Sequence, residues 1–224
     1  MSDSTLVNGK FYHIYNRSIH GYNLFTDSQD YERFLVLITK FISPIVDVYA
    51  WVLMPKHFHM LVRIRDKMVY QYSKEVCDQL GLDFNEVKWQ TMELPGLSEN
   101  QNFSTTPKSH LHFSHLFNAY SKYFNKRHNR YGTLFQRPFK RKQVDNPSYL
   151  KNIILYIHNN PVHHGFCDHA MEYPWSSYLT SLSISPTHLK RDAVIGWFDN
   201  KANFKSSHDA KIDVIAIDKW LDLV

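Results

Sequence analysis

The chain has 224 residues, of which 43% are hydrophobic and 21% are charged, the balance of a globular protein rather than of a disordered one. Lys and Arg outnumber Asp and Glu by 26 to 21, an excess that permits a polyanionic partner without requiring one. Two cysteines are too few for a disulfide framework or a cysteine zinc site.

The first part of the chain alternates between strand and helix patterns. Aromatic and β-branched residues predict a strand over 10–17, and Asp27 or Ser28 caps a helix that Pro44 ends. The near-continuous apolar run 46–54 predicts a second strand. Residues 57–65 alternate along a third strand, with Phe58, Met60 and Val62 on one face and His57, His59, Leu61 and Arg63 on the other.

The second part is less regular. We predict a helical piece over 69–80, a loop over 94–107, a helix over 108–128 and an extended segment over 132–144, which Pro138 makes a broken or edge strand. Asn146 and Pro147 begin a helix that runs to about Asn160 and is ended by Pro161 and Gly165. A last amphipathic piece covers 212–223. This succession predicts an α+β sandwich with one sheet and helices on one face.

Two histidines stand one residue apart in the third strand. His57 and His59 must point to the same face, where both imidazoles can reach one divalent cation while Phe58 anchors the strand from the opposite face. Such a pair is also common as a polar feature without a metal, so the spacing alone leaves both readings open.

Tyr156 and Asn160 stand one turn apart on the helix that begins at Pro147. They lie along one edge of its apolar stripe, Leu150, Ile153, Ile154 and Ile157. A tyrosine at this border can present its hydroxyl to a cleft, and an amide oxygen one turn away can be a third ligand for a cation. The alternative is that Tyr156 packs on the sheet and Asn160 caps the helix.

Basic and aromatic residues are interleaved between 130 and 142. Charges for phosphates and rings for bases would suit single-stranded nucleic acid, although a solvated basic face accounts for the same pattern. The candidate binding residues are Arg130, Tyr131, Phe135, Arg137, Phe139, Lys140, Arg141 and Lys142.

Five motifs, in order, resemble those of the HUH-type single-tyrosine transposases. The branch they resemble most is that of the REP-associated tyrosine transposases, in the insertion-sequence-200-like superfamily. The resemblance runs from about residue 10 to residue 178. The motifs are FYHIYNR (11–17), WVLMPKHFHMLV (51–62), GTLFQR (132–137), YIHNNPV (156–162) and YPWSSY (173–178).

The resemblance implies a ferredoxin-like antiparallel sheet with helices packed on it, followed by a mostly helical C-terminal extension. It implies a catalytic domain over 1–165, with an insertion at about 66–106, and an extension over 166–224. His57 and His59 would bind Mg²⁺ or Mn²⁺, and Tyr156 would be the nucleophile. Asn160 would be the third ligand, at a position where the insertion-sequence relatives often have Gln.

The implied activity is metal-dependent cleavage and rejoining of single-stranded or hairpin DNA through a 5′-phosphotyrosine intermediate. A tyrosine with an ordinary pKa of about 10 needs a metal or a base, and His13 and His158 are candidates for the base by composition only. We expect a monomer or homodimer, with the branch favouring the monomer. No signal peptide or apolar stretch of membrane-spanning length is evident, so we expect a cytoplasmic protein without membrane contact.

Three other readings remain. A domesticated, non-catalytic nucleic-acid-binding protein would keep the basic surface but needs none of the four site residues. A replication-initiating nuclease would use the same chemistry, although the motifs at 156–162 and 173–178 resemble transposases more closely. A structural zinc protein fits poorly, because an asparagine is a weak zinc ligand.

Overall fold

A computed structural model of the protein describes residues 5–94, 105–210, 217 and 219. Its centre is a four-stranded antiparallel sheet in the order β2-β3-β1-β6, made of Val46–Met54, His57–Ile64, Phe11–Arg17 and Lys140–Val144. Helix α1 (Ser28–Phe41) connects β1 to β2, and helix α4 (Ser109–Arg127) precedes β6. The β-α-β-β-α-β succession is that of a ferredoxin-like fold, which confirms the predicted fold class.

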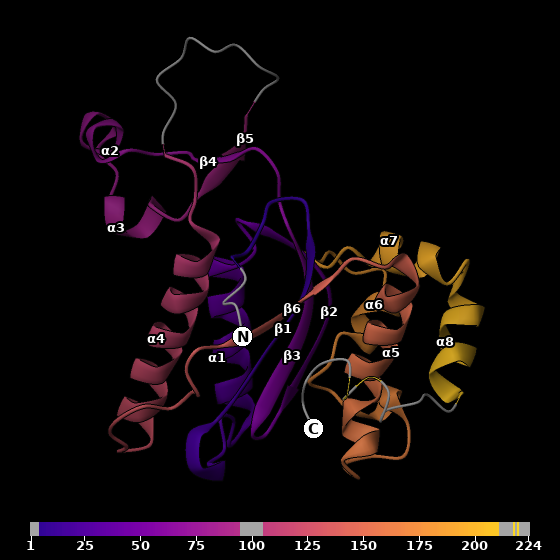
Figure 1. Ribbon diagram of the computed structural model, residues 1–224. Helices are drawn as coiled ribbons and strands as arrows, with labels where there is room; N and C mark the ends of the chain where they lie inside the picture. Colours follow the sequence, from indigo (N-terminus) through magenta and orange to yellow (C-terminus); the bar gives the residue numbers. More distant parts are fainter. Residues whose placement is uncertain (1–4, 95–104, 211–216, 218, 220–224) are drawn as a thin grey trace.

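Helices cover both faces of this sheet, so the expectation of helices on one face is wrong. Helices α1 and α4 lie on one side, and α5 (Pro147–His163) lies on the other (Figure 1). The reason is that the central strands are apolar on both faces. Val52 and Leu61 are fully buried in a second cluster together with Ile153 and Ile157 of α5. A second apolar face has to be covered by a second layer.

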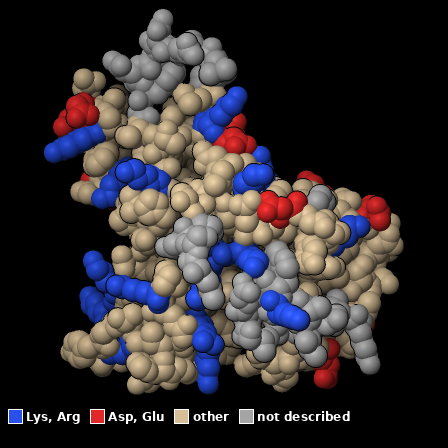
Figure 2. All heavy atoms as spheres, in the orientation of Figure 1, with Lys and Arg blue, Asp and Glu red and all other residues tan. Residues whose placement is uncertain are grey.

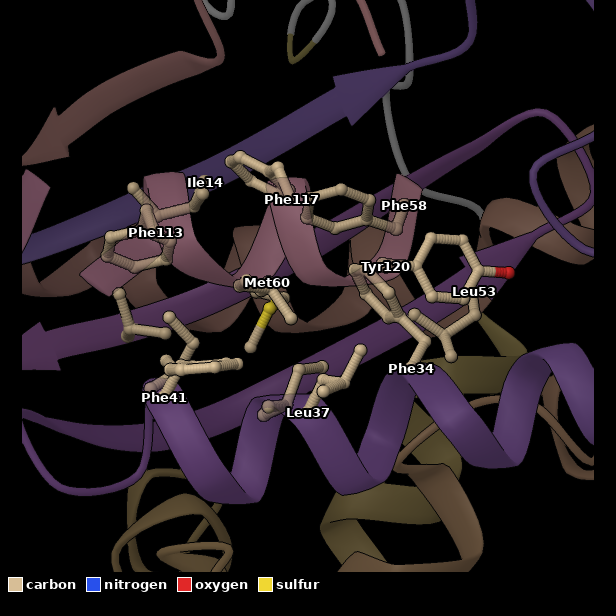
Figure 3. Packing of buried hydrophobic residues seen from close by; sticks show 14 of the residues in the cluster. Ile14, Phe34, Leu37, Phe41, Leu53, Phe58, Met60, Phe113, Phe117 and Tyr120 are labelled. Atoms are coloured by element: carbon tan, nitrogen blue, oxygen red, sulfur yellow. The ribbon is translucent and has the colours of Figure 1, made fainter. Parts of the chain in front are cut away.

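The core between the sheet and helices α1 and α4 is built largely from aromatic rings. Phe58 and Met60 of β3 pack there against Phe34 of α1 and Phe117 of α4 (Figure 3). Val62 belongs to the same cluster, whereas Leu61 belongs to the cluster under α5. The predicted alternation of β3 is therefore confirmed.

Helix α1 begins where its cap was predicted. The Asp27 carboxylate accepts hydrogen bonds from the backbone N–H groups of Gln29 and Asp30. Asp30 is fully buried, and its carboxylate accepts a hydrogen bond from Arg127 at 2.7 Å. This buried ion pair ties the start of α1 to the end of α4.

Helix α5 passes the proline that was expected to end it. It runs to His163, and Pro161 lies inside its last turn. A proline there removes one donor, yet the following backbone groups remain paired, because His164 N–H donates to the Asn160 carbonyl. Gly165 follows the cap residue His164, and its φ of +70° lies in the left-handed region that stops the helix. Asn160 is consequently a helical residue and not a cap.

The insertion forms a small unit at one end of α4 (Figure 1). Strands β4 and β5 pair as an antiparallel hairpin around two short helices, so the predicted helix over 69–80 is right only in its second half. The Tyr70 hydroxyl contacts buried His112 of α4 at 2.8 Å and so joins the insertion to the core. The predicted loop over 94–107 lies largely outside the described residues. The elements are β4 (Met68–Tyr70), α2 (Lys74–Leu80), α3 (Phe84–Val87) and β5 (Thr91–Glu93).

The segment after α5 is helical, as predicted, and packs beside it. Residues 173–178 first run along β2, where Leu53 N–H donates to the Trp175 carbonyl and Ser177 N–H to that of Trp51. The helices are η1 (Ile19–Gly21) near the start of the chain and, after α5, η2 (Ala170–Glu172), α6 (Tyr178–Leu182), α7 (Arg191–Trp197) and α8 (Lys201–Asp209). The amphipathic piece predicted over 212–223 lies almost wholly outside the described residues, and the boundary at 165/166 stays a prediction. Across the described ranges, no helix is long and apolar enough to cross a membrane.

Truncation of Phe58 tests how far this core supports β3. We expect Phe58→Ala to lower the free energy of unfolding by about 3–5 kcal/mol, because a fully buried ring is lost and a cavity remains. Phe166→Ala, at a ring that is 54% exposed, should change it by less than about 0.5 kcal/mol. Urea unfolding measures both, and equal losses would show that Phe58 has no special part in the core.

Candidate active site

The two histidines of β3 face α5. Their cross-strand partners in β1 are Arg17 for His57 and Tyr15 for His59, so these side chains share one face of the sheet. The rings of His57 and His59 lie 5.1 Å apart, centroid to centroid. Phe58 holds the strand between them from the opposite face, as the sequence pattern indicated.

Helix α5 brings its two candidate residues to the same place. Asn160 is 1% exposed, and its Oδ1 lies 2.9 Å from His57 Nε2. Tyr156, one turn earlier, is 4% exposed, and its ring stands edge-on to that of His59 at 5.5 Å. The four residues His57, His59, Tyr156 and Asn160 are therefore gathered within a single chain.

A third buried histidine completes the cluster. His13 of β1 is fully buried, and its Nε2 lies 3.0 Å from His59 Nδ1. The two rings are parallel within 1°, with centroids 5.0 Å apart. His13 Nδ1 is buried and has no hydrogen-bond partner among the described residues. Because the contact occupies His59 Nδ1, it leaves Nε2 as the nitrogen of His59 that can face a ligand.

Burial keeps these imidazoles neutral. Removal from water lowers the pKa of His13 to about 3 and that of His57 to about 4, with the contact to Asn160 partly offsetting the latter. Burial also lowers the pKa of His59 well below its ordinary value, with neighbouring histidines adding to the effect. Neutral rings retain the lone pairs that a metal requires.

The donor set fits a divalent cation. Two neutral imidazoles and one amide oxygen would be provided by His57, His59 and Asn160. Adjacent ligands of an octahedral ion with bonds of about 2.1 Å are about 3 Å apart, close to the 2.9 Å between His57 Nε2 and Asn160 Oδ1. Among the described residues, no group of three His, Cys, Asp or Glu is placed to hold a metal, so the amide would be an essential third ligand.

His158 lies elsewhere and does not face the tyrosine. It is fully buried, with Nε2 2.7 Å from Ser177 Oγ and Nδ1 2.9 Å from His208 Nε2. His208 Nδ1 donates to the Phe204 carbonyl, which can only accept. His208 Nε2 must then accept from His158, and His158 Nε2 from Ser177. This relay occupies both nitrogens of His158, which is therefore a packing residue and not a candidate base.

Two further histidines stand at the end of α5, and sequence reasoning missed them. The His164 ring lies 5.1 Å from that of His57, and the His163 ring lies 6.4 Å from that of Tyr156. Both are exposed. Their signal in the sequence was their place within one turn of Asn160, which the assumption of a helix end at Pro161 concealed.

The basic segment is divided between two faces of the edge strand β6. Lys140 and Lys142 pair with Tyr15 and His13, on the face of the histidines, whereas Arg141 lies on the other face with its guanidinium over Phe139. Further out, Arg130 is held by Asn125 and the Thr133 carbonyl, and Arg137 is exposed.

Phe135 lies mostly in the core, so its ring offers little surface for the stacking on bases that the sequence suggested. The ring is 4% exposed and packs in the core against Phe34, Phe58 and Phe117. A short antiparallel bridge pairs Phe135 with Ser18, at the end of β1. Tyr131, by contrast, is 92% exposed.

The low pKa of His13 predicts how the free energy of unfolding depends on pH. The unfolded chain takes up a proton near pH 6.5 and folded His13 only near pH 3, so stability present at neutral pH is lost as the pH falls below 6.5. His13→Gln should reduce this slope by about 1.4 kcal/mol per pH unit between pH 6.5 and 5. Urea unfolding at several pH values measures the slope. Exposed His188→Gln is the control, and an unchanged slope in His13→Gln would mean that His13 is charged in the folded protein.

Comparison with known proteins found a similar fold in one solved structure. No family model and no curated protein matches the chain. One solved structure, described as a REP-associated tyrosine transposase bound to a REP hairpin, aligns with a TM-score of 0.51. The alignment covers 83% of this chain and 88% of that one at 16% sequence identity. At this identity the likeness shows that the two chains share a fold.

Proposed function

We propose that the protein is a metal-dependent single-stranded DNA endonuclease and strand transferase of the REP-associated tyrosine transposase type. The observation that carries this proposal is the meeting of Tyr156, His57, His59 and Asn160 at one place, brought there by β3 and α5. Binding of nucleic acid alone would require none of the four. Cleavage through a tyrosine requires a phenol beside a group that stabilises charge on phosphate, and this cluster offers both.

Single-stranded or hairpin DNA is the proposed substrate. A protein with the same fold has been solved with a REP hairpin, which supports a hairpin as the partner. Lys140 and Lys142 lie on the face of the site, where they would pair with phosphates on either side of the reacting one. The monomer is the proposed state, since all four site residues come from one chain.

The reaction would be a transesterification. The Tyr156 oxygen attacks the phosphorus and forms a 5′-phosphotyrosine bond, while the bond to the 3′ oxygen breaks. The phenol loses its proton and the departing 3′ oxygen gains one, so one phosphodiester replaces another. Because the bond energy is retained, the 3′-hydroxyl of a second strand can reverse the step and join to the held phosphate.

The neighbouring residues would prepare this step. A bound Mg²⁺ or Mn²⁺ would polarise the non-bridging oxygens and stabilise charge on the departing 3′ oxygen. His57, His59 and Asn160 would hold it, and His13 would fix the ring of His59 with Nε2 toward the site. Burial of Tyr156 against the rings of His13 and His59 would restrict the rotation of its ring.

Removal of one hydroxyl tests the nucleophile. Tyr156→Phe should abolish the covalent DNA adduct and cleavage, while DNA affinity and stability change little, because the packed ring is kept. The measurement is a denaturing gel of end-labelled hairpin DNA with Mg²⁺ or Mn²⁺. Tyr149→Phe, on the same helix, is the matched control and should retain the adduct. An adduct from Tyr156→Phe would identify another nucleophile, and Tyr15, stacked near His59, would be tested next.

Metal affinity can be tested without any reaction. Isothermal titration of the DNA-free protein with Mn²⁺ should reveal one site. His57→Ala and Asn160→Ala should each weaken it by at least about tenfold, whereas Asn160→Gln, which keeps an amide oxygen, should weaken it less. Exposed His188→Ala is the control. If Asn160→Ala binds Mn²⁺ as tightly as the wild type, the Asn160 amide is not a metal ligand.

A further inference from the structure

A cleft of about 630 Å³ opens beside the edge strand, on the side of the sheet that carries α4. One wall is a single face of α4, where Ser114, Phe117, Asn118 and Ser121 follow each other at helical spacing. The other wall is the segment 135–141, which leads into β6. The volume lies within the range of pockets that hold small organic ligands.

The lining combines rings, uncommitted polar groups and cations. The apolar part comes from Phe139, which is partly exposed, and from the edge of Phe117, which is 9% exposed; their ring centroids lie 5.4 Å apart. The Asn118 amide and the Ser121 hydroxyl form no hydrogen bond within the described part of the protein, and neither does the exposed guanidinium of Arg137. None of the described lining residues is acidic. Over α4, at the lower left of Figure 2, Lys and Arg likewise predominate.

This chemistry matches a nucleotide. Aromatic side chains receive the face of a base, amides and hydroxyls read its edge, and an arginine pairs with phosphate. A duplex offers no free base face, so the ligand would be an unpaired nucleotide. A purely apolar ligand would leave Asn118 and Arg137 unused, and an anion alone would not need the rings.

The edge strand joins this cleft to the active site. Successive residues of β6 point to opposite faces, so Arg141 lines the cleft while Lys140 and Lys142 lie on the face of the histidines. Lys140 is opposite Tyr15, which is opposite His59. Only two strand spacings, about 10 Å, therefore separate Lys140 from the candidate metal ligand. A DNA strand that crosses β6 from the cleft to the histidines would meet Arg141 on one face, and Lys140 and Lys142 on the other.

We propose that this cleft binds one unpaired nucleotide of the same DNA strand whose phosphate reaches Tyr156. The base would stack on Phe139, whose ring is only partly buried, with its edge at Asn118 and the phosphate at Arg137. The strand would bend around β6 to reach the histidines. This inference rests on the proposed function and adds a recognition site on the opposite face of the sheet.

An abasic scan tests it. The full-length Tyr156→Phe variant, which cannot cleave, is titrated by fluorescence anisotropy with hairpin DNA that carries a single-stranded flank. Abasic sites replace the flank nucleotides one at a time. One position should weaken affinity by about tenfold, the value of a lost stacking contact. Adding Asn118→Ala and Arg137→Ala together should lower the affinity for intact DNA similarly and remove the abasic effect. Lys126 is exposed on α4 outside the cleft. Adding Lys126→Ala should weaken the binding of intact and abasic DNA by the same factor, so the abasic effect remains.

The outcomes separate this proposal from the function on which it rests. If no abasic position matters, or if Lys126→Ala removes the effect as the cleft variant does, the cleft proposal is overturned, even where wild-type protein still forms the Tyr156 adduct. If the abasic effect depends on Asn118 and Arg137 but no adduct forms, the cleft stands and the catalytic proposal fails. Thermal melting of the cleft variant verifies that α4 remains folded.

Discussion

The two-residue period of β3 is the constraint on which the rest of the structure depends. One set of side chains, including Phe58 and Met60, closes the core with α1 and α4, while the alternate set places His57 and His59 under α5. A shift of register by one residue would bury the histidines among aromatic rings and turn Phe58 toward the site. The largely buried pairing of β3 with β1 opposes this shift, so packing on one face of the sheet determines the geometry of the other.

Among the residues that the structure describes, no acidic side chain joins the groups that meet at the candidate site. Neutral imidazoles and an amide oxygen leave the charge of a divalent cation unbalanced by the protein. If the proposed function holds, phosphate oxygens of the DNA would supply the missing negative charge, while Lys140 and Lys142 lie on the same face of the sheet. Metal and DNA would consequently bind with positive cooperativity, because the cation and the phosphates carry opposite charges.

Local patterns were enough to predict β2, the start of α1 and the alternation of β3, whereas the ferredoxin-like sheet was expected only from the resemblance of the motifs. The meeting of His57 with Asn160 followed from strand parity and helix spacing once the two elements were adjacent. What sequence patterns missed depends on tertiary contacts. The second apolar face is visible only when the strands are paired, Phe135 is buried by rings from distant elements, and the His13 contact requires the β1-β3 register. Pro161 was misjudged because a proline in a last turn costs only one hydrogen bond.

The relay through His158 has a consequence for how the chain can be divided. Both of its ring nitrogens find their partners in the segment after α5, at Ser177 and His208, while Ser177 in turn accepts from Trp51 N–H in β2. Each bond in the series has one direction, so the loss of either end leaves a buried donor or acceptor without a partner. A shortened chain ending at residue 165 would strip the helix that carries Tyr156 of these contacts. The described part of the extension is thus a folding partner of α5 and not a removable tail.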